Sequence, residues 1–391
     1  MRRDYSIVLL SSGMKRSGIK RFKHPAWSAV ACASLIGSSA VSFAADLVAR
    51  LKAPPGFEVS LFAEVRAPRQ LASGPDGLVF VGTSGPGKVL ALRDADGDGV
   101  AEQTWTIAKG LDRPAGVVWR DDALYIGEVT RISRIRGLAQ SLESPPAAET
   151  VLSGLPEMRG HAVKYLALDA EGALYLPVGV PCNICEPDSP HGEILRLAPG
   201  ATQAKSWARG LRNSAGLAFH PETGDLWFTD NGRDWLGDDL PSCELNRATG
   251  PGQHFGYPWR HGLAVEDPEF GSRRPSDQQL TPPVFELGAH VAPLGLAFHS
   301  GKGLPAAYRN TLFIAEHGSW NRSRKSGYRV VRVVLDAAGE KVIQHEPFLT
   351  GWLQGQEAWG TPADVLVLPD GSLLVSDDSS HRIFRITYRG D

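Results

Sequence analysis

Apolar and polar positions along the chain form a unit that recurs six times. Each copy has an apolar strand, a turn containing Asp, Gly or Pro, and a second strand with aromatic or β-branched residues. The copies begin at Leu71, Gly116, Leu166, Gly216, Gly295 and Val365. Alternating third strands are expected at Ile194–Leu197, Val330–Val333 and Ile383–Ile386. No window longer than about ten residues keeps a helical period without Gly or Pro, so the pattern predicts an all-β chain.

The copies start 45, 50, 50, 79 and 70 residues apart. Four-stranded propeller blades need roughly 40 to 50 residues each, and such a blade buries its two faces only against neighbouring blades. We therefore predict one domain over residues 45–391, a six-bladed β-propeller with two long insertions. Loops on one face of such a fold converge on the central channel, where residues distant in sequence can share a site.

Residues 1–44 are predicted to be a signal peptide. A basic cluster at Lys15–Lys23 precedes an apolar stretch from Ala26 to Phe43, and Ser42-Phe43-Ala44 has the small residues of a cleavage site. Ser and Gly interrupt the apolar stretch, and no stop-transfer pattern follows it. We expect a periplasmic or secreted protein whose mature chain has no integral membrane segment.

Charge and cysteine content narrow the classes of partner. The net charge of −2 gives no electrostatic reason to expect nucleic acid or an anionic membrane surface. Cys182 and Cys185 form a C-x-x-C pair, which in an oxidising compartment predicts a local disulfide. Cys243 is then either a buried thiol or the partner of a group that the sequence does not identify.

Three segments next to predicted strands concentrate polar side chains. His161 precedes the third unit, and its unperturbed pKa of about 6.5 suits a general base. Arg212 and Asn213 enter the fourth unit, where a guanidinium could bind a carboxylate or a quinone oxygen. Taken singly, such residues more often brace loops. The third segment is Thr229–Asp234, and longer motifs follow it. Together they favour a shared functional site over separate loop-bracing roles.

These segments, in this order, resemble the glucose/sorbosone dehydrogenase family of soluble quinoproteins. Members are six-bladed propellers that hold pyrroloquinoline quinone (PQQ) and calcium on their top face. The resemblance runs from Pro54-Pro-Gly-Phe57 to the end of the chain. It is closest to the sorbosone dehydrogenase-like branch, through Asn231–Asp239, Gly252–Pro258 and Glu316–Arg322.

The resemblance implies a role for each matching residue. His161 would be the catalytic base and would also contact the cofactor, Arg212 would bind the cofactor and polarise the quinone oxygen, and Asn213 would hold the cofactor. The backbone carbonyls of Gly232 and Arg233 would bind Ca²⁺, which prefers oxygen ligands and would act as a Lewis acid. The implied substrate is a small sugar or aldehyde. Electrons would pass to a separate acceptor, because no haem motif is present.

The sequence departs from the family at two places. Some members clamp the quinone carboxylates with a Lys and two Arg near the C-terminal blades, whereas Gly360–Asp364 contains no Arg. Arg322 is predicted to substitute, with Arg324 and Lys325 as alternatives. Cys243 stands where the family usually has Asp.

A separate acidic loop predicts a structural calcium site unrelated to catalysis. Oxygen ligands stand at loop positions 1, 3, 5 and 9, with Gly at position 6, as in the first half of an EF-hand loop. The predicted ligands are Asp94, Asp96, Asp98 and Glu102. The same residues also suit an acidic hairpin turn.

Four tryptophans lie in loops beside polar residues: Trp235, Trp320, Trp352 and Trp359. A flat indole there could stack on a sugar or on the quinone, but core packing is the expectation for each one.

Two other functions stay open, because fold does not determine function. One is a calcium-dependent lactonase-type hydrolase, with Asp230, Asn231 and Glu244 as ligands. The other is a non-catalytic carbohydrate-binding propeller.

Overall fold

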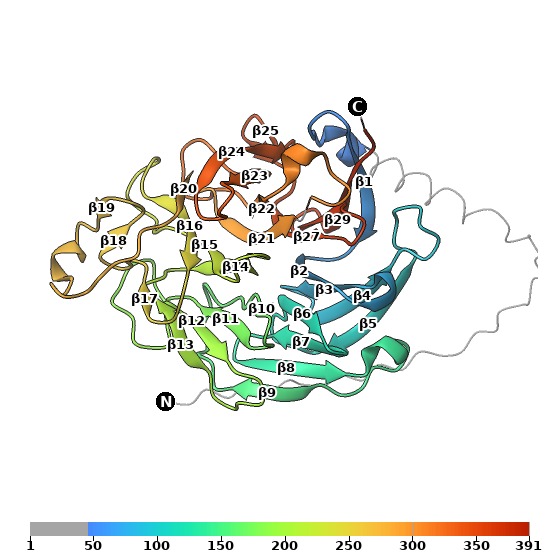
Figure 1. The fold of residues 1–391 in the computed structure, drawn as a ribbon, viewed down its shortest axis with the longest axis horizontal. Coiled ribbons are helices and arrows are strands. Elements are labelled where there is room, and N and C mark those ends of the chain that lie inside the picture. Colours follow the sequence, from blue (N-terminus) through green and yellow to red (C-terminus); the bar gives the residue numbers. More distant parts are fainter. Residues whose placement is uncertain (1–45, 300, 391) are drawn as a thin grey trace, which may run out of the picture. The chain divides into compact units, whose positions relative to one another are not determined.

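The computed structural model describes residues 46–299 and 301–390, and the predicted signal peptide at residues 1–44 lies outside them. In this part of the chain, six sheets are arranged around a central axis (Figure 1). The described residues contain little helix. One short α-helical turn covers residues 46–50, and 3₁₀ turns lie at Pro75–Gly77, Leu138–Gln140, Gly271–Arg273 and Ala306–Tyr308. The predicted all-β, six-bladed propeller is confirmed.

The sheets follow one another along the chain as blades, and the inner three strands of each blade are consecutive and antiparallel. Blade 1 contains β2 (Pro68–Ser73), β3 (Val79–Thr83), β4 (Lys88–Arg93) and β5 (Gln103–Lys109). Blade 2 contains β6 (Gly116–Arg120), β7 (Ala123–Gly127), β8 (Arg131–Arg136) and β9 (Glu149–Ser153). Blade 3 contains β10 (Ala167–Leu168), β11 (Leu174–Val178), β12 (Glu193–Leu197), β13 (Lys205–Arg209) and a parallel outer strand, β17 (Gln253–His254).

The last three blades carry the two long insertions. Blade 4 contains β14 (Ser214–Phe219), β15 (Leu226–Asp230), β16 (Ser242–Ala248) and β20 (Phe285–Ala289). Blade 5 contains β21 (Pro293–His299), β22 (Thr311–Glu316), β23 (Arg329–Leu335) and β24 (Val342–Leu349). Blade 6 contains β27 (Pro362–Val367), β28 (Leu373–Asp377), β29 (Arg382–Tyr388) and the N-terminal strand β1 (Phe57–Glu64). Two small hairpins stand apart, β18 (Arg260–His261) with β19 (Val265–Glu266), and β25 (Leu353–Gln354) with β26 (Glu357–Ala358).

Strand β1 closes the ring of blades. It pairs antiparallel with β29, with Phe57 opposite Tyr388 and Glu64 opposite Arg382. The N-terminal strand therefore completes the last blade and covers an edge that would otherwise remain unpaired. This strand is absent from the sequence prediction, because it does not belong to any of the six repeated units.

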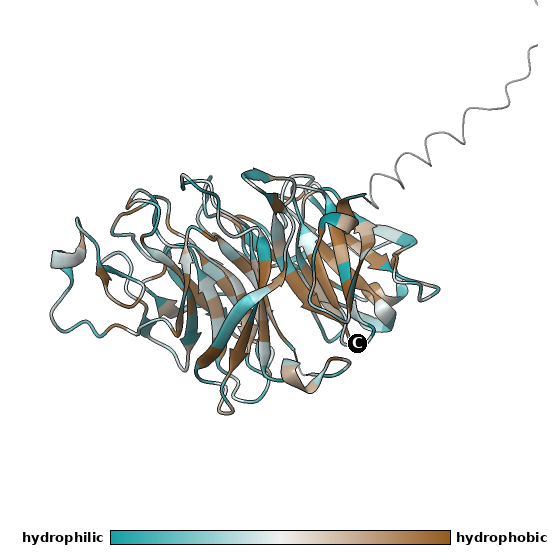
Figure 2. Cartoon of the chain, turned by 90° about the horizontal axis from the view of Figure 1, so that it is seen from above, coloured by the Kyte–Doolittle hydropathy of each residue, from teal (hydrophilic) through white to brown (hydrophobic). Residues whose placement is uncertain are grey.

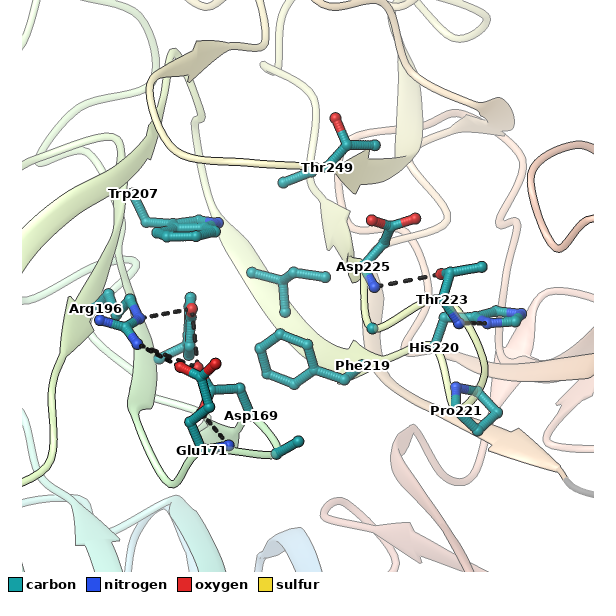
Figure 3. A pocket seen from close by; sticks show the side chains of 15 residues that line it. Asp169, Glu171, Arg196, Trp207, Phe219, His220, Pro221, Thr223, Asp225 and Thr249 are labelled. Carbon is teal, nitrogen blue, oxygen red and sulfur yellow. Dashed lines mark hydrogen bonds and ion pairs between the residues drawn. The ribbon is translucent and has the colours of Figure 1, made fainter.

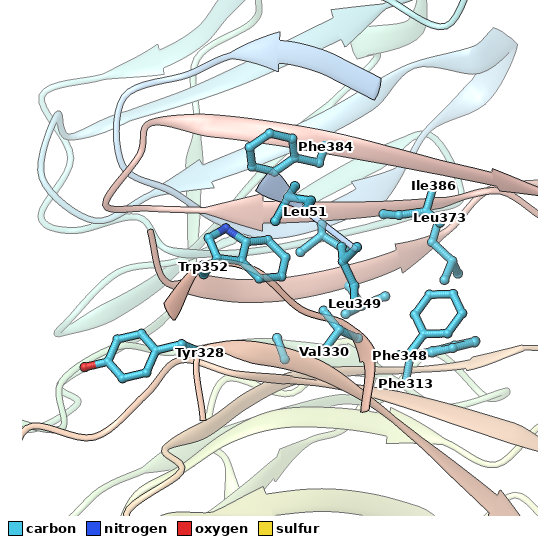
Figure 4. Packing of buried hydrophobic residues seen from close by; sticks show 13 residues of the cluster. Leu51, Phe313, Tyr328, Val330, Phe348, Leu349, Trp352, Leu373, Phe384 and Ile386 are labelled. Carbon is cyan, nitrogen blue, oxygen red and sulfur yellow. The ribbon is translucent and has the colours of Figure 1, made fainter. Parts of the chain in front are cut away.

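The hydrophobic core lies between neighbouring blades. Apolar residues concentrate in the strands and polar residues in the loops (Figure 2). Between blades 5 and 6, Phe313 packs against Phe348 with ring centroids 4.6 Å apart, and Trp352 packs against Phe384 at 6.1 Å in the same cluster (Figure 4). Trp352 is fully buried and its indole nitrogen donates to Asp377 Oδ2 at 2.7 Å, so the core packing expected for this tryptophan is confirmed.

The strand register places the candidate residues on one face. The first residue of each innermost strand lies near the last residue of the second strand, as in the pairs Gly116–Gly127 and Ser214–Asp230. Loops that precede innermost strands and loops that follow second strands therefore share a face, called here the upper face. Within the described residues, none of the helices reaches the length and apolarity needed to cross a bilayer.

Candidate functional site on the upper face

His161 lies on the upper face, in the segment that leads to β10. Its Nδ1 is 2.9 Å from the carbonyl oxygen of Val180, so Nδ1 carries the proton and Nε2 keeps its lone pair. Burial, reinforced by the nearby charge of Arg212, lowers the pKa of His161 to about 4. The imidazole is therefore neutral at pH 7. A side chain at Gly179 would lie 2.6 Å from the His161 Cβ, so the glycine allows this close approach.

The Arg212 guanidinium is buried and mostly occupied by protein acceptors. Nε donates to the Asn183 carbonyl at 2.8 Å, and Nη2 donates to Asn183 Oδ1 at 2.8 Å and Asp234 Oδ2 at 3.0 Å. Nη1 donates to the Asn231 carbonyl at 3.3 Å. A guanidinium has five N–H groups, so one on Nη1 is left without a partner among residues 46–299 and 301–390. Arg212 thus braces a loop and still has one donor for a ligand.

Asn183 belongs to the predicted disulfide loop, and the structure confirms the Cys182–Cys185 disulfide. Besides binding Arg212, the Asn183 amide nitrogen donates to the Asp234 carbonyl at 3.0 Å, and its Oδ1 accepts the Asp234 N–H at 2.8 Å. The loop therefore connects Arg212 to the segment after β15. Sequence reasoning missed Asn183. The signal available was a polar side chain between the two cysteines.

Asp230, the last residue of β15, orders the start of β14. Its carboxylate accepts the backbone N–H groups of Arg212 and Asn213 at 2.9 and 2.8 Å, and the Ser214 hydroxyl at 3.0 Å. Burial nevertheless raises the pKa of Asp230 to about 6. The side-chain amide of Asn213 makes no hydrogen bond to a described residue, so it is available to a ligand.

Gly232 and Arg233 follow β15, next to Asp234. Arg233 is buried, and its Nη1 lies 2.5 Å from Asp267 Oδ2, which also lies 2.9 Å from His261 Nε2. Through these bonds the Arg233 side chain is held against the insertion that contains β18 and β19. Among the hydrogen bonds of the described chain, none is accepted by the backbone carbonyl of Gly232 or Arg233, so both carbonyls can still bind a cation.

A lone buried ammonium lies three residues after His161. Lys164 is fully buried, its Nζ donates to the Ala162 carbonyl at 2.8 Å, and it forms no ion pair within the described residues. Burial lowers the pKa of Lys164 to about 8. An unpaired buried charge is unfavourable, so an anionic group bound next to Lys164 would be stabilised by it. PQQ carries carboxylates, so a buried ammonium at this position fits the charge of that cofactor.

Arg322 joins two upper-face loops. Its Nη1 donates to the Asp238 carbonyl at 2.6 Å, and its Nη2 donates to Asp239 Oδ1 at 2.9 Å. Both contacts lie in the loop after β15, whereas Arg322 itself follows β22. The structure does not bring Arg322 into contact with His161 or Arg212. Its predicted contact with the cofactor stays a prediction.

The four predicted calcium ligands of the acidic loop lie close together in blade 1. They do not belong to the group of candidate residues on the upper face. Ligand oxygens of Asp94, Asp96, Asp98 and Glu102 lie within 4.8 Å of one another. The loop joins β4 to β5, on the face opposite the upper face. Asp94 already accepts hydrogen bonds from the backbone of Gly97 and Gly99 and pairs with Arg385 at 3.0 Å. Both the calcium loop and the acidic turn fit this arrangement.

A separate cavity of about 580 Å³ lies between blades 3 and 4 (Figure 3). It is lined by the turns that end their innermost strands, so it opens away from the upper face. The aromatic rings of Trp207 and Phe219 border it, and Arg196 pairs with Glu171 at 3.4 Å on its wall. None of the predicted site residues lines this cavity.

Comparisons with known proteins agree with the motifs. A family model described as TrAA12-like matches residues 262–388. An uncharacterized protein of Borreliella burgdorferi is 32% identical over 364 residues, covering 90% of this chain and 94% of that protein. The aldose sugar dehydrogenase of Escherichia coli (strain K12) is 24% identical over 279 residues, covering 64% of this chain and 67% of that protein.

The fold is also similar to that of a solved structure, the holo form of the PQQ domain of pyranose dehydrogenase from Coprinopsis cinerea. It has a TM-score of 0.71 and 18% identity, and the match covers 86% of this chain and 97% of that chain. The chain belongs to the glucose/sorbosone dehydrogenase-like family of propeller proteins, as its motifs predict.

Proposed function

We propose that the protein is a PQQ- and calcium-dependent dehydrogenase that oxidises an aldose, a sorbosone-like aldehyde or a related sugar. The observation that carries this proposal is the convergence of unused binding groups on the upper face. They are Nε2 of neutral His161, one N–H of Arg212, the amide of Asn213 and the carbonyls of Gly232 and Arg233. The activities named for the related proteins support the same assignment.

The residues divide the work of such a reaction between them. Bound PQQ would supply the hydride acceptor and calcium would supply a Lewis acid. His161 takes the hydroxyl proton at Nε2, because the Val180 carbonyl holds the other ring proton at Nδ1. Arg212 and Asn213 orient the quinone through hydrogen bonds. Lys164 supplies positive charge for a carboxylate of the cofactor.

Calcium would be held by the carbonyls of Gly232 and Arg233. The Asp234 backbone next to them is fixed by Asn183, which keeps this segment in place without a bound ion. The predicted cofactor contact of Arg322 is left out of the proposal, because both of its bonded nitrogens already bind the Asp238–Asp239 loop.

The hydrolase alternative gains no support from the geometry. Burial raises the pKa of Glu244 to about 8, which favours the protonated form and weakens it as a calcium ligand. Its two oxygens accept hydrogen bonds from Asn246 and Gly262 at 2.9 and 2.6 Å. Asp230 is likewise occupied by the backbone N–H groups of Arg212 and Asn213, directly before β14.

The test is reconstitution of the purified mature chain with PQQ and calcium, followed by dye reduction with a panel of sugars. We expect sugar-dependent turnover that requires both additions. Lactone hydrolysis without PQQ would favour the hydrolase. If the protein retained no quinone after gel filtration, the proposal would be contradicted. Export to the periplasm and a separate electron acceptor belong to the same proposal, and fractionation of cells tests the first.

A further inference from the structure

Two tryptophans expected in the core lie exposed on the upper face instead. Trp235 is 66% exposed and Trp320 is 71% exposed. Their ring centroids are 5.6 Å apart at an interplanar angle of 84°, so one indole presents its edge to the face of the other. The expectation of core packing is therefore wrong for this pair. Large exposed aromatic pairs at the mouth of a channel are typical of ligand-binding surfaces.

The pair is built from the loops of two blades, and both loops are held in place. Trp235 follows β15 and Trp320 follows β22. Arg322 connects them through its bonds to Asp238 and Asp239. The Tyr328 hydroxyl donates to the Ser319 carbonyl at 2.6 Å, directly before Trp320. The corner formed by the two rings is thus a fixed feature of this face.

The backbone of Trp235 provides an independent sign of function. Its φ of 71° lies in the left-handed region, which bulky side chains rarely adopt and glycine adopts freely. Strained conformations of this kind gather at ligand-contacting positions. The side chain gains no burial in return, since most of it faces solvent.

Position relative to the proposed active site indicates what the pair contacts. Trp235 directly follows Asp234, whose carboxylate lies 3.0 Å from Arg212 Nη2. Rings this exposed do not enclose a cofactor, and they are accessible from solvent beside the proposed active site.

We propose that Trp235 and Trp320 form a stacking platform for a sugar unit adjacent to the one that is oxidised. Pyranose rings carry apolar C–H faces that stack on indoles and hydroxyls that suit nearby polar groups. The substrate class is then a saccharide of two or more units, oxidised at one end. This inference rests on the proposed function for the position of the reacting sugar. The carboxylates of Asp238 and Asp239 beside the platform disfavour an anionic bilayer as the occupant.

Binding of glucose, cellotriose and maltotriose to the protein without PQQ tests the platform separately from catalysis. Trp235→Gly suits the left-handed backbone, so it removes the ring without straining the loop. Trp320→Ser removes the other ring. Ile343→Ser, on β24, is the control, because Ile343 is 66% exposed and lies away from the upper face.

We expect one trisaccharide to bind the wild-type protein at least about tenfold tighter than glucose, and each tryptophan variant to lose about tenfold of that affinity. Kinetics of the PQQ- and calcium-loaded enzyme should show the loss as a raised KM for the trisaccharide, with glucose kinetics and Tm unchanged. Equal affinity for glucose and both trisaccharides, or variants that bind like Ile343→Ser, would overturn the inference. Self-association through the two tryptophans would also overturn the inference. It would appear in gel filtration as an oligomer that the tryptophan variants abolish. Trisaccharide binding without any dye reduction would refute the proposed oxidation but keep the platform.

Discussion

His161 combines a left-handed backbone, with φ of 49°, and a pKa of about 4 that burial imposes first and the Arg212 charge second. Few residues other than glycine adopt this conformation without strain, although Asn and His do so more often than most. The imidazole is consequently held in one place and in one protonation state. Both properties suit a base that must be ready above pH 5.

The pH dependence of activity should follow this low pKa. We expect kcat/KM to stay level from pH 8 to about pH 5 and to fall below it with a midpoint near 4, since the protonated imidazole cannot accept a proton. The unfolded chain binds this proton near pH 6.5, so the contribution of His161 to stability declines as pH falls from 6.5 toward 4. A rate profile with its midpoint near 6.5 would contradict the assignment.

Replacement of His161 gives the corresponding rate prediction. His161→Asn suits the left-handed backbone, so the fold should be retained. Loss of a general base typically lowers rates by about 10² to 10⁴. We expect kcat to fall within that range while the affinity for PQQ, followed by tryptophan fluorescence, changes by less than threefold. Unchanged kcat would remove His161 from the reaction.

Lys164 makes a prediction in which stability and binding change in opposite directions. Lys164→Met replaces an unpaired buried ammonium with an apolar chain of similar length, so the apo protein should gain about 1 to 3 kcal/mol. The affinity for PQQ should drop about tenfold, because the positive charge near its carboxylates is lost. Thermal unfolding and PQQ titration measure the two effects. Tighter or unchanged PQQ binding would show that Lys164 does not face the cofactor.

At the scale of elements, the Cys182–Cys185 loop sets the geometry of the site. Asn183 accepts two hydrogen bonds from Arg212 and holds Asp234 from both sides. The disulfide restricts this loop, and the Tyr257 hydroxyl accepts the backbone N–H of Cys185 at 3.0 Å. One short loop therefore positions both the guanidinium and the segment expected to bind calcium.

Removing these bonds should weaken the site without unfolding the blades. Asn183→Ala removes the Oδ1 acceptor of Arg212 Nη2 and the side-chain bonds to Asp234, while the backbone carbonyl that accepts from Arg212 Nε remains, so we expect kcat/KM to fall about 10- to 100-fold. The apparent affinity for calcium should fall as well. Asn183→Asp, which keeps the acceptor oxygen but loses the donor to Asp234, should lie between wild type and Asn183→Ala. Calcium titrations monitored by activity provide the measurement, and equal behaviour of all three proteins would contradict the positioning role.

Comparison of these elements with the sequence shows which features a local pattern can predict. The innermost strands match the repeated units closely, because alternation with a buried face is a local signal that recurs in every blade. His161, Arg212 and Asn213 were found through motifs and do lie on one face. Strand β1 and the parallel strand β17 were not predicted, since each pairs with a partner far away in sequence. Lys164 was missed because its burial arises from the packing of several blades.

For the whole molecule, closure by β1 is expected to control stability. A ring of blades that lacks this strand exposes the edge of β29. Deletion of residues 46–64 should therefore lower the Tm markedly and promote association of the exposed edge. Thermal unfolding and gel filtration compare it with a chain that lacks only residues 46–51. A monomer with an unchanged Tm would show that closure contributes little.

The arrangement of six blades also explains why the site has so few residues from any one element. Each blade contributes one or two loops to the upper face, and the six blades are arranged around a common centre (Figure 1). Binding of cofactor at this mouth should stabilise the whole ring, because a ligand that binds only the native state raises the free energy of unfolding.

The central claim is that this mouth binds PQQ and calcium in order to oxidise a sugar. The most direct measurement is dye reduction by the purified mature chain with a sugar panel, with PQQ and calcium added together, singly or not at all. Turnover that requires both additions and is lost in His161→Asn is the predicted result. Absence of turnover with every sugar, together with no retention of PQQ by the correctly folded protein, would contradict the claim.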